Sequence, residues 1–445
     1  MCAAFFTLMI AVLVASLAAA AEMPGNVKEP QAAQEVLSGS RTVANAAWWG
    51  FDEEDATEAL QAAINSGAKR VIVPNMTRDW IVRPITLAGD QELVLEEGVV
   101  ITAKRGEYRG KGDSVLRATD VSNLTIRGYG ATVRMQKEDY IVGKVLLDLG
   151  WNRWFGQYEK AEWRMPLALG GCTNVKVYGL TLRDSGGDGI YVDGSAKQPY
   201  SKDIHIKDVV CDNNYRQGIS IIGADGLLVE NCVFANTWGT PPSAGADLEP
   251  DSPKNILRDI VFRNCLFKDN YGDGIEVFLS NLTADSGDVS ILFENCRVTS
   301  KWGPGIRVTK VQDTGPGGFI EFRDCVVENT EAYGIKVQEK SADRARLKFI
   351  NCTIRNAANN RSYADAWAPI TLSLKQMTRF GGIDFVDCLV EDDRDRPAVV
   401  VEGAALELGL FDVTGTITVR NPYGLKHNLG EKQEGVTLVI KESAW

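Results

Sequence analysis

The stretch GDGIEV, residues 272–277, decides the fold, because close copies of it recur along the chain. The copies are GDGIYV (187–192), RQGISI (216–221), AGADLE (244–249), GPGIRV (303–308) and AYGIKV (332–337). In each, a glycine precedes alternating apolar residues, and successive glycines lie 27 to 31 residues apart. A repeat of this length is typical of solenoids, and the alternation indicates a strand with one buried face.

A second motif recurs in phase with the first, and it places a cysteine after an asparagine or aspartate. Its cysteines are Cys232, Cys265, Cys296, Cys325, Cys352 and Cys388. Cysteines in one repeated position are expected to form a column of small buried side chains, so we predict neither disulfides nor metal ligation for them. The preceding asparagines are expected to form a hydrogen-bonded ladder between coils.

Two short strands per repeat and no helical pattern between them predict an all-β fold, a right-handed single-stranded parallel β-helix. An amphipathic segment at residues 55–67 predicts an N-terminal capping α-helix. The expected organisation is a signal peptide (1–21), a linker (22–46), the β-helix domain (47–412) and C-terminal capping strands (413–445).

Composition bounds the class of protein. The 445 residues carry a net charge of −11 without a basic block, which argues against a nucleic-acid partner. The first residues form an apolar run ending in small residues, as in a secretory signal, and no later segment is apolar enough to span a membrane. We therefore expect a secreted or periplasmic protein; the sequence does not indicate its oligomeric state.

The residue two places after each repeated glycine should face outward. Read coil by coil, this position holds Tyr191, Ser220, Asp247, Glu276, Arg307 and Lys336. Asp247 and Glu276 would then stand about 4.8 Å apart on neighbouring strands, and Asp247 and Glu249 about 6.6 Å apart on one strand. Like charges this close raise one pKa, so one carboxyl can be a proton donor while another is a base.

Such a pair of carboxyls suits glycoside hydrolysis, and the wider spacing favours an inverting enzyme. We predict Asp247, Glu249, Glu276 and Asp188 as catalytic residues. The predicted substrate-binding residues are Asp273, Arg307, Lys336, Gln217, Arg216, Tyr191, Trp154, Trp163, Arg164 and Trp238. The tryptophans and Arg164 come from a long insertion, residues 134–166, and from a segment before Asp247, where indole rings can stack on sugars and cations can pair with anions.

The chain resembles the pectate-lyase-like superfamily of right-handed parallel β-helix proteins over about residues 47–410. SGGDGI (185–190) resembles the Asn-Thr-Asp-Gly-Ile segment of polygalacturonases, which implies a catalytic role for Asp188. GIRVTK (305–310) resembles their Arg-Ile-Lys segment, which implies that Arg307 binds substrate. Their paired aspartates and their Gly-His-Gly segment have no match, and Gln217 stands where a histidine is expected, so the resemblance implies a different substrate.

Three functions remain open. The first is a secreted glycoside hydrolase that cleaves a plant or algal polysaccharide or oligosaccharide, an anionic one included, without a cofactor. The second is a polysaccharide lyase in which Asp247, Glu249 and Glu276 hold Ca²⁺ and Lys336 or Arg307 takes a proton. The third is a non-catalytic carbohydrate-binding protein. The two histidines, His205 and His427, lack partners at ligand spacing, so no zinc site is expected.

Overall fold

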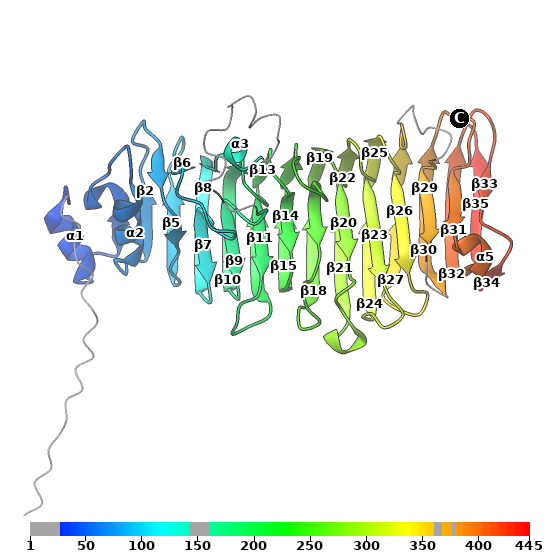
Figure 1. Ribbon diagram of the computed structural model, residues 1–445, viewed down its shortest axis with the longest axis horizontal. Coiled ribbons are helices and arrows are strands. Elements are labelled where there is room, and N and C mark those ends of the chain that lie inside the picture. The colour runs from blue at the N-terminus through cyan, green and yellow to red at the C-terminus, as the bar shows by residue number, and fades with distance from the viewer. Residues whose placement is uncertain (1–26, 142–157, 159–160, 360–366, 376–378) are drawn as a thin grey trace, which may run out of the picture.

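The computed structural model describes residues 27–141, 158, 161–359, 367–375 and 379–445. In these residues the chain winds into an elongated stack of parallel strands that runs from the N-terminal to the C-terminal end (Figure 1). The predicted all-β parallel β-helix is confirmed. The predicted signal peptide, residues 1–21, lies outside the described residues.

The repeated glycine motif forms the first row of strands, a 12-stranded parallel sheet. Its strands are β4 (Ile85–Thr86), β7 (Leu116–Thr119), β9 (Leu167–Gly170), β11 (Ile190–Asp193), β14 (Gln217–Ile221), β17 (Ala244–Leu248), β20 (Ile275–Phe278), β23 (Ile306–Val311), β26 (Ile335–Lys340), β29 (Ile370–Leu374), β31 (Val399–Gly403) and β33 (His427–Asn428). We call it the site sheet, because it carries the outward acidic residues.

A 23-stranded sheet supplies the other two sides of each coil, in two rows that share the long strands. Its strands are β1 (Val43–Asn45), β2 (Arg70–Val73), β3 (Trp80–Val82), β5 (Gln91–Leu95), β6 (Val100–Ala103), β8 (Ser122–Arg134), β10 (Thr173–Arg183), β12 (Ser201–Lys207), β13 (Val210–Asp212), β15 (Ala224–Glu230), β16 (Val233–Ala235), β18 (Leu257–Arg263), β19 (Leu266–Asn270), β21 (Val289–Glu294), β22 (Arg297–Ser300), β24 (Gly318–Arg323), β25 (Val326–Thr330), β27 (Arg346–Ile350), β28 (Thr353–Arg355), β30 (Phe380–Glu391), β32 (Leu410–Arg420), β34 (Gln433–Glu434) and β35 (Thr437–Ser443). A typical coil therefore has three strands, one more than the two repeated motifs predicted.

The interior is built from columns of identical side chains. Ile190, Ile219, Ala246, Ile275, Ile306 and Ile335 lie in register along the site sheet, as predicted. The opposite side carries a stack of phenylalanines that the sequence analysis did not identify: Phe262, Phe293, Phe322, Phe349 and Phe385. Neighbouring ring centroids in this stack lie 4.8–5.3 Å apart, close to the spacing of strands.

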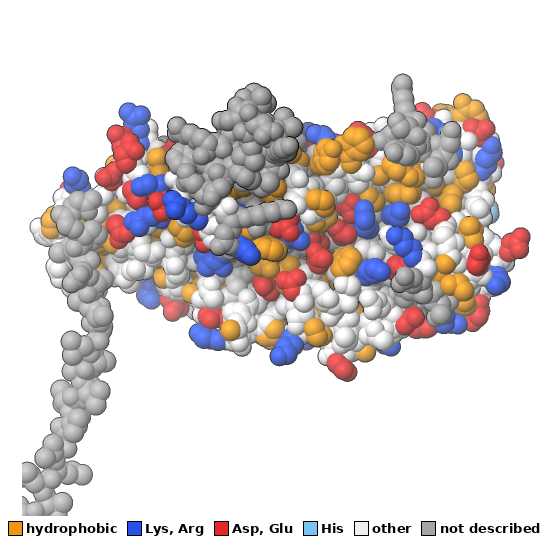
Figure 2. Space-filling view, in the orientation of Figure 1, with side chains coloured by type: hydrophobic (Ala, Val, Ile, Leu, Met, Phe, Trp, Pro, Cys, Tyr) orange, Lys and Arg blue, Asp and Glu red, His pale blue; other side chains and the backbone are white. Residues whose placement is uncertain are grey.

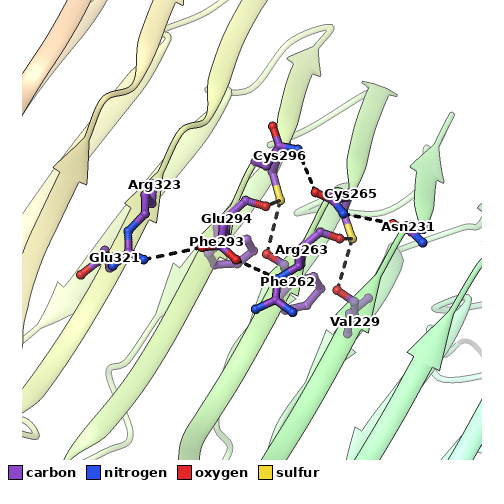
Figure 3. Close-up of polar contacts among 12 residues, drawn as sticks. Val229, Asn231, Phe262, Arg263, Cys265, Phe293, Glu294, Cys296, Glu321 and Arg323 are labelled. Atoms are coloured by element: carbon purple, nitrogen blue, oxygen red, sulfur yellow. Dashed lines mark hydrogen bonds and ion pairs between the residues drawn. The ribbon is translucent and has the colours of Figure 1, made fainter.

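The cysteine and asparagine columns occupy the turn between the two rows of the large sheet (Figure 3). The Cys296 thiol is buried and donates to the Phe262 carbonyl oxygen, and the cysteines of the described residues are free. Asn295 Nδ2 donates to Asn264 Oδ1 at 2.8 Å, and Asn295 has a φ of 52°, a left-handed conformation that asparagine tolerates well. Both predicted ladders are confirmed.

Helices occur chiefly at the ends: α1 (Pro30–Leu37), α2 (Thr57–Asn65), α3 (Lys137–Tyr140) and α5 (Ala405–Leu408), with the 3₁₀ turns η1 (Ala46–Trp49) and η2 (Ala284–Ser286). The predicted capping helix is α2, whose apolar residues join the core at the N-terminal end (Figure 1).

Two predicted boundaries are corrected. The expected linker, residues 22–46, contains α1 and β1, and β1 pairs in parallel with β2, so the first coil starts earlier. The expected C-terminal cap begins inside β32, which pairs with β30 and β35 in the large sheet. Residues 413–443 therefore continue the β-helix, because their backbone groups join the hydrogen-bond ladder of the large sheet.

Candidate functional site

The predicted outward column exists and lies on the site sheet. The register pairs Tyr191 with Ser220, Ser220 with Asp247, Asp247 with Glu276, Glu276 with Arg307, and Arg307 with Lys336. Figure 2 shows acidic side chains over the middle of the viewed face with basic side chains beside them toward the C-terminal end. We call this row the charged column.

Asp247 and Glu276 form the centre of the column. Asp247 is 1% exposed and Glu276 is 7% exposed, although both are ionisable. Burial raises the pKa of Asp247 well above its ordinary value, and the neighbouring Glu276 and Glu249 raise it further. Burial likewise raises the pKa of Glu276 to about 8, with Asp273 adding to the effect. The pair therefore retains a proton at neutral pH.

Gln217 holds Asp247 in place. Its side-chain Nε2 donates to Asp247 Oδ2 at 2.6 Å, and its Oε1 accepts from the Ala244 backbone N–H at 2.9 Å. These two bonds fix the amide orientation and leave Asp247 Oδ1 without a hydrogen bond from any described residue. Gln217, which was predicted to bind substrate, is fully buried and contacts Asp247 through the hydrogen bond from its Nε2.

Arg216 lies on the N-terminal side of the pair, between two further carboxylates. Its guanidinium is 3.4 Å from Glu249 Oε2 and 3.8 Å from Asp188 Oδ2. Asp188 is fully buried, and burial raises its pKa to about 7 even though Arg216 opposes the shift. The Glu249 side chain is 31% exposed, because β17 ends at Leu248. Arg216 thus contacts the catalytic candidates rather than lying apart from them.

Arg307 has the same role on the C-terminal side. Its Nε lies 2.7 Å from Asp273 Oδ2 and 4.0 Å from Glu276 Oε1. Burial raises the pKa of Asp273 to about 6, against the lowering effect of Arg307. Charge repulsion among the acids is therefore partly balanced by one arginine at each end of the cluster.

Lys336 follows Arg307 in the column. Its Nζ lies 4.0 Å from the centre of the Tyr333 ring and 3.5 Å from Glu402 Oε1. Burial lowers the pKa of Lys336, and the charge on Arg307 lowers it further, whereas Glu402 raises it. Glu402 comes from β31, two strands beyond β26, and its role was not predicted because it lies outside the repeated motifs used to align the coils.

Several buried polar atoms of the cluster make no hydrogen bond to any described residue. Two of them are Asp247 Oδ1 and Arg216 Nε, whereas the Asp188 carboxylate interacts with the Ser220 hydroxyl and the Gln217 backbone N–H. Buried polar atoms in proteins are nearly always paired, and exceptions gather at functional sites. Asp247 lies on β17 and Arg216 just before β14, so both unpaired atoms belong to the cluster around the charged column.

The described residues include only two of the three tryptophans that were predicted to bind substrate. Trp163 is 42% exposed, and the adjacent Arg164 bridges to Gly186 close to Asp188 in sequence and space. Trp238 is 45% exposed, and its Nε1 donates to Asn213 Oδ1. Trp154 lies outside the described residues.

Arg164 requires a correction. Its side chain is 1% exposed, and it donates to the backbone carbonyls of Tyr108 and Arg109. The guanidinium also packs over the Tyr140 ring. It is an internal support of the insertion, because its donors are directed at backbone oxygens rather than at the surface.

The lyase alternative would place Ca²⁺ between Asp247, Glu249 and Glu276. Within the described residues, no group of three or more His, Cys, Asp or Glu side chains is placed to hold a metal ion. The carboxyls of Asp247, Glu249 and Glu276 each lie beside an arginine, a glutamine or another carboxyl. Among the described helices, none is long and apolar enough to cross a membrane.

Comparisons with known proteins agree with this architecture. The family model for the right handed beta helix region matches residues 167–287 and 285–375. The uncharacterized protein YclG of Bacillus subtilis is 25% identical over 226 residues, 46% of this chain, and the chain spans 38% of that relative's length.

Three solved structures share the fold. The mannuronan C-5 epimerase AlgE6 A-module of Azotobacter vinelandii has a TM-score of 0.58 and 15% identity, covering 89% of this chain and 99% of the other. The surface adhesin PfbA of Streptococcus pneumoniae has a TM-score of 0.57 and 13% identity, covering 91% and 93%. The exopolygalacturonase of Thermotoga maritima has a TM-score of 0.51 and 14% identity, covering 93% and 96%.

The chain thus has the right-handed parallel β-helix fold that its sequence predicted, and residues 167–375 match the family model for that fold. At these identities the neighbours establish the fold, which hosts enzymes and an adhesin alike. The functional proposal therefore rests on the residues of the charged column.

Proposed function

We propose that this protein is an exported carbohydrate-active enzyme that hydrolyses glycosidic bonds by carboxyl general acid–base catalysis. The observation that carries the proposal is the pair of Asp247 and Glu276, buried side by side on β17 and β20 with both pKa values raised. Hydrolysis of a glycoside needs one protonated carboxyl to protonate the leaving oxygen and one carboxylate to activate water or attack the sugar.

The described residues support a division of roles. The proton shared by Asp247 and Glu276 is available at neutral pH for the leaving group, and Gln217 keeps Asp247 oriented toward the surface. Glu249 is the more exposed carboxylate and can act on water. Arg307 and Lys336 lie next in the column, where a carboxylate or sulfate on the sugar would be paired, so an anionic plant or algal polysaccharide fits best.

Polysaccharide digestion tests the proposal directly. The purified protein is incubated with a panel of plant and algal polysaccharides, and new reducing ends are measured together with the ultraviolet absorbance of unsaturated uronates. We expect reducing ends without that absorbance, and loss of product in Asp247→Asn and Glu276→Gln but not in Glu407→Gln, an exposed residue of α5. Unchanged product release in both site variants would refute the proposal.

A lyase is the second candidate, and Lys336 favours it. Burial and Arg307 lower the pKa of its ammonium group, which suits an amine that takes the proton beside a uronate carboxylate. Elimination would then produce an unsaturated sugar in the same digestion. If that absorbance appears and is lost in Lys336→Gln, the lyase replaces the hydrolase as the conclusion.

A further inference from the structure

Four consecutive coils each place one aromatic residue in the turn just before their strand of the site sheet. Tyr271 precedes β20, Trp302 precedes β23, Tyr333 precedes β26 and Trp367 precedes β29. The Tyr271 and Trp302 ring centroids lie 5.8 Å apart, and those of Tyr333 and Trp367 lie 5.3 Å apart. We call these four residues the aromatic column.

The aromatic column is unlike the phenylalanine stack of the interior, because two of its rings are exposed and the other two are half-buried. Tyr271 is 49% exposed and Trp302 is 51% exposed. A single exposed aromatic is ordinary, but here two pairs of neighbouring rings follow each other on four successive coils, and gathered apolar surface of this kind marks binding surfaces.

The strip borders the charged column. Asp273 lies two residues after Tyr271 in the same turn, and its carboxylate meets Arg307. The Lys336 ammonium lies over the Tyr333 ring. Trp302 is joined to the preceding coil by a hydrogen bond from its backbone N–H to the Tyr271 carbonyl oxygen at 3.0 Å, so the turn that carries both rings is held by the coil stack.

We propose that the aromatic column is a glycan-binding platform on which the rings of a polysaccharide stack one after another along the long axis of the β-helix. Pyranose C–H groups carry partial positive charge, and aromatic faces are negative, so a sugar face and an indole or phenol ring attract each other while both lose water. The platform starts beside Glu276 and extends toward the C-terminal end. The bound polymer therefore has several sugars on that side of the reacting bond.

This inference rests on the proposed function for the choice of a polysaccharide as ligand, but it is tested by binding rather than by cleavage. Native gels containing polygalacturonate, alginate, xylan or galactomannan are run with Asp247→Asn as the non-cleaving parent. The double substitution Tyr271→Ala/Trp302→Ala is then made in the Asp247→Asn protein. This double variant should bind the polymer that retards the parent about tenfold more weakly. Tyr423→Ala, a control at an equally exposed tyrosine far along the chain, should be retarded like the parent.

High ionic strength distinguishes binding by the aromatic column from binding by the charged column. Charge attraction from Arg307 and Lys336 is screened at high ionic strength, whereas stacking persists, so the difference between parent and double variant should remain in about 1 M salt. Equal retardation of parent and double variant, or no retardation of the parent by any of the four polymers, overturns the inference. So does a double variant whose gel-filtration volume changes while its retardation is kept, because the strip would then be a protein interface.

The cleavage assay keeps this result distinct from the proposed function. With intact Asp247, the double variant should raise KM for the polymer and leave kcat nearly unchanged, because the stacked sugars do not touch the reacting bond. A parent that is retarded through the aromatic column yet releases no product would refute the enzyme and leave the platform.

Discussion

Replacing Glu276 with glutamine should stabilise the folded protein, and the gain should depend on pH. Glu276 is 7% exposed on β20 beside Asp247, and burial raises its pKa from 4.5 to about 8. Glutamine has nearly the same shape and stays neutral at every pH. The substitution therefore removes the cost of ionising a buried carboxyl without opening a cavity.

The sign and size follow from proton linkage. Between pH 4.5 and about 8 the folded protein holds a proton that the unfolded chain has released, so the unfolding free energy of the parent falls as pH rises through this interval. Each pH unit is worth about 1.4 kcal/mol, and Asp247 shares the same proton uptake, so Glu276→Gln should be more stable by roughly 2 to 5 kcal/mol above pH 8. Below pH 4.5 the two proteins should be equally stable.

Urea unfolding followed by circular dichroism, at pH 4 and at pH 9, measures this difference. Solenoids can unfold in parts, so midpoints are compared only where parent and variant have the same slope. Glu407→Gln, which changes an exposed carboxylate on α5, should show no pH-dependent gain. The reasoning is refuted if Glu276→Gln is no more stable than the parent at pH 9, since the carboxyl would then be stabilised in its charged form.

Three further outcomes are expected. Asp247→Asn should fold normally and lose at least about 100-fold in rate, measured as reducing ends, because a general acid–base group is removed; a smaller loss would place the proton elsewhere. Asn295→Ala should lower the unfolding free energy by about 1.5 to 3 kcal/mol, because it removes the hydrogen bond to Asn264 and places alanine in a left-handed conformation, at φ 52°. Asn295→Gly should lower it less, because glycine adopts this φ without strain. Equal losses in the two variants would show that backbone strain does not contribute. The described cysteines should react with a thiol reagent only after unfolding, since all are buried. Peptide mapping that finds label on Cys296 or another of these residues in the native protein would contradict the column.

The sequence predicted the site sheet well, because the physical cause of its register is local. A glycine followed by alternating apolar residues specifies which side chain faces inward, so Asp247 and Glu276 could be placed on one outward column before any contact was known. The same rule identified Arg307 and Lys336 as their neighbours. In a solenoid the neighbour of a residue is its counterpart one coil away, which makes long-range contacts readable from the repeat.

What the sequence could not predict depends on contacts outside the repeat. The direction of the Arg164 guanidinium is set by the backbone carbonyls of Tyr108 and Arg109, which come from an earlier coil. Gln217 could have faced a sugar, but its amide is fully buried and bonded to the Ala244 N–H and to Asp247 Oδ2. The third strand of each coil was missed because the coils were aligned on the glycine and cysteine motifs alone, although a phenylalanine three residues before the cysteine marks this strand in five coils.

The site also explains why the coil of β17 differs from its neighbours. Ala246 stands where the coils on either side have isoleucine, so this coil contributes less apolar burial at the point where Asp247 carries a buried carboxyl. Both features cost stability, and stability in a solenoid is a sum over coils and their interfaces. The phenylalanine, cysteine and asparagine columns run on the far sides of these coils. The fold can therefore tolerate several buried carboxyls on one sheet, because the two other sides hold the coils together.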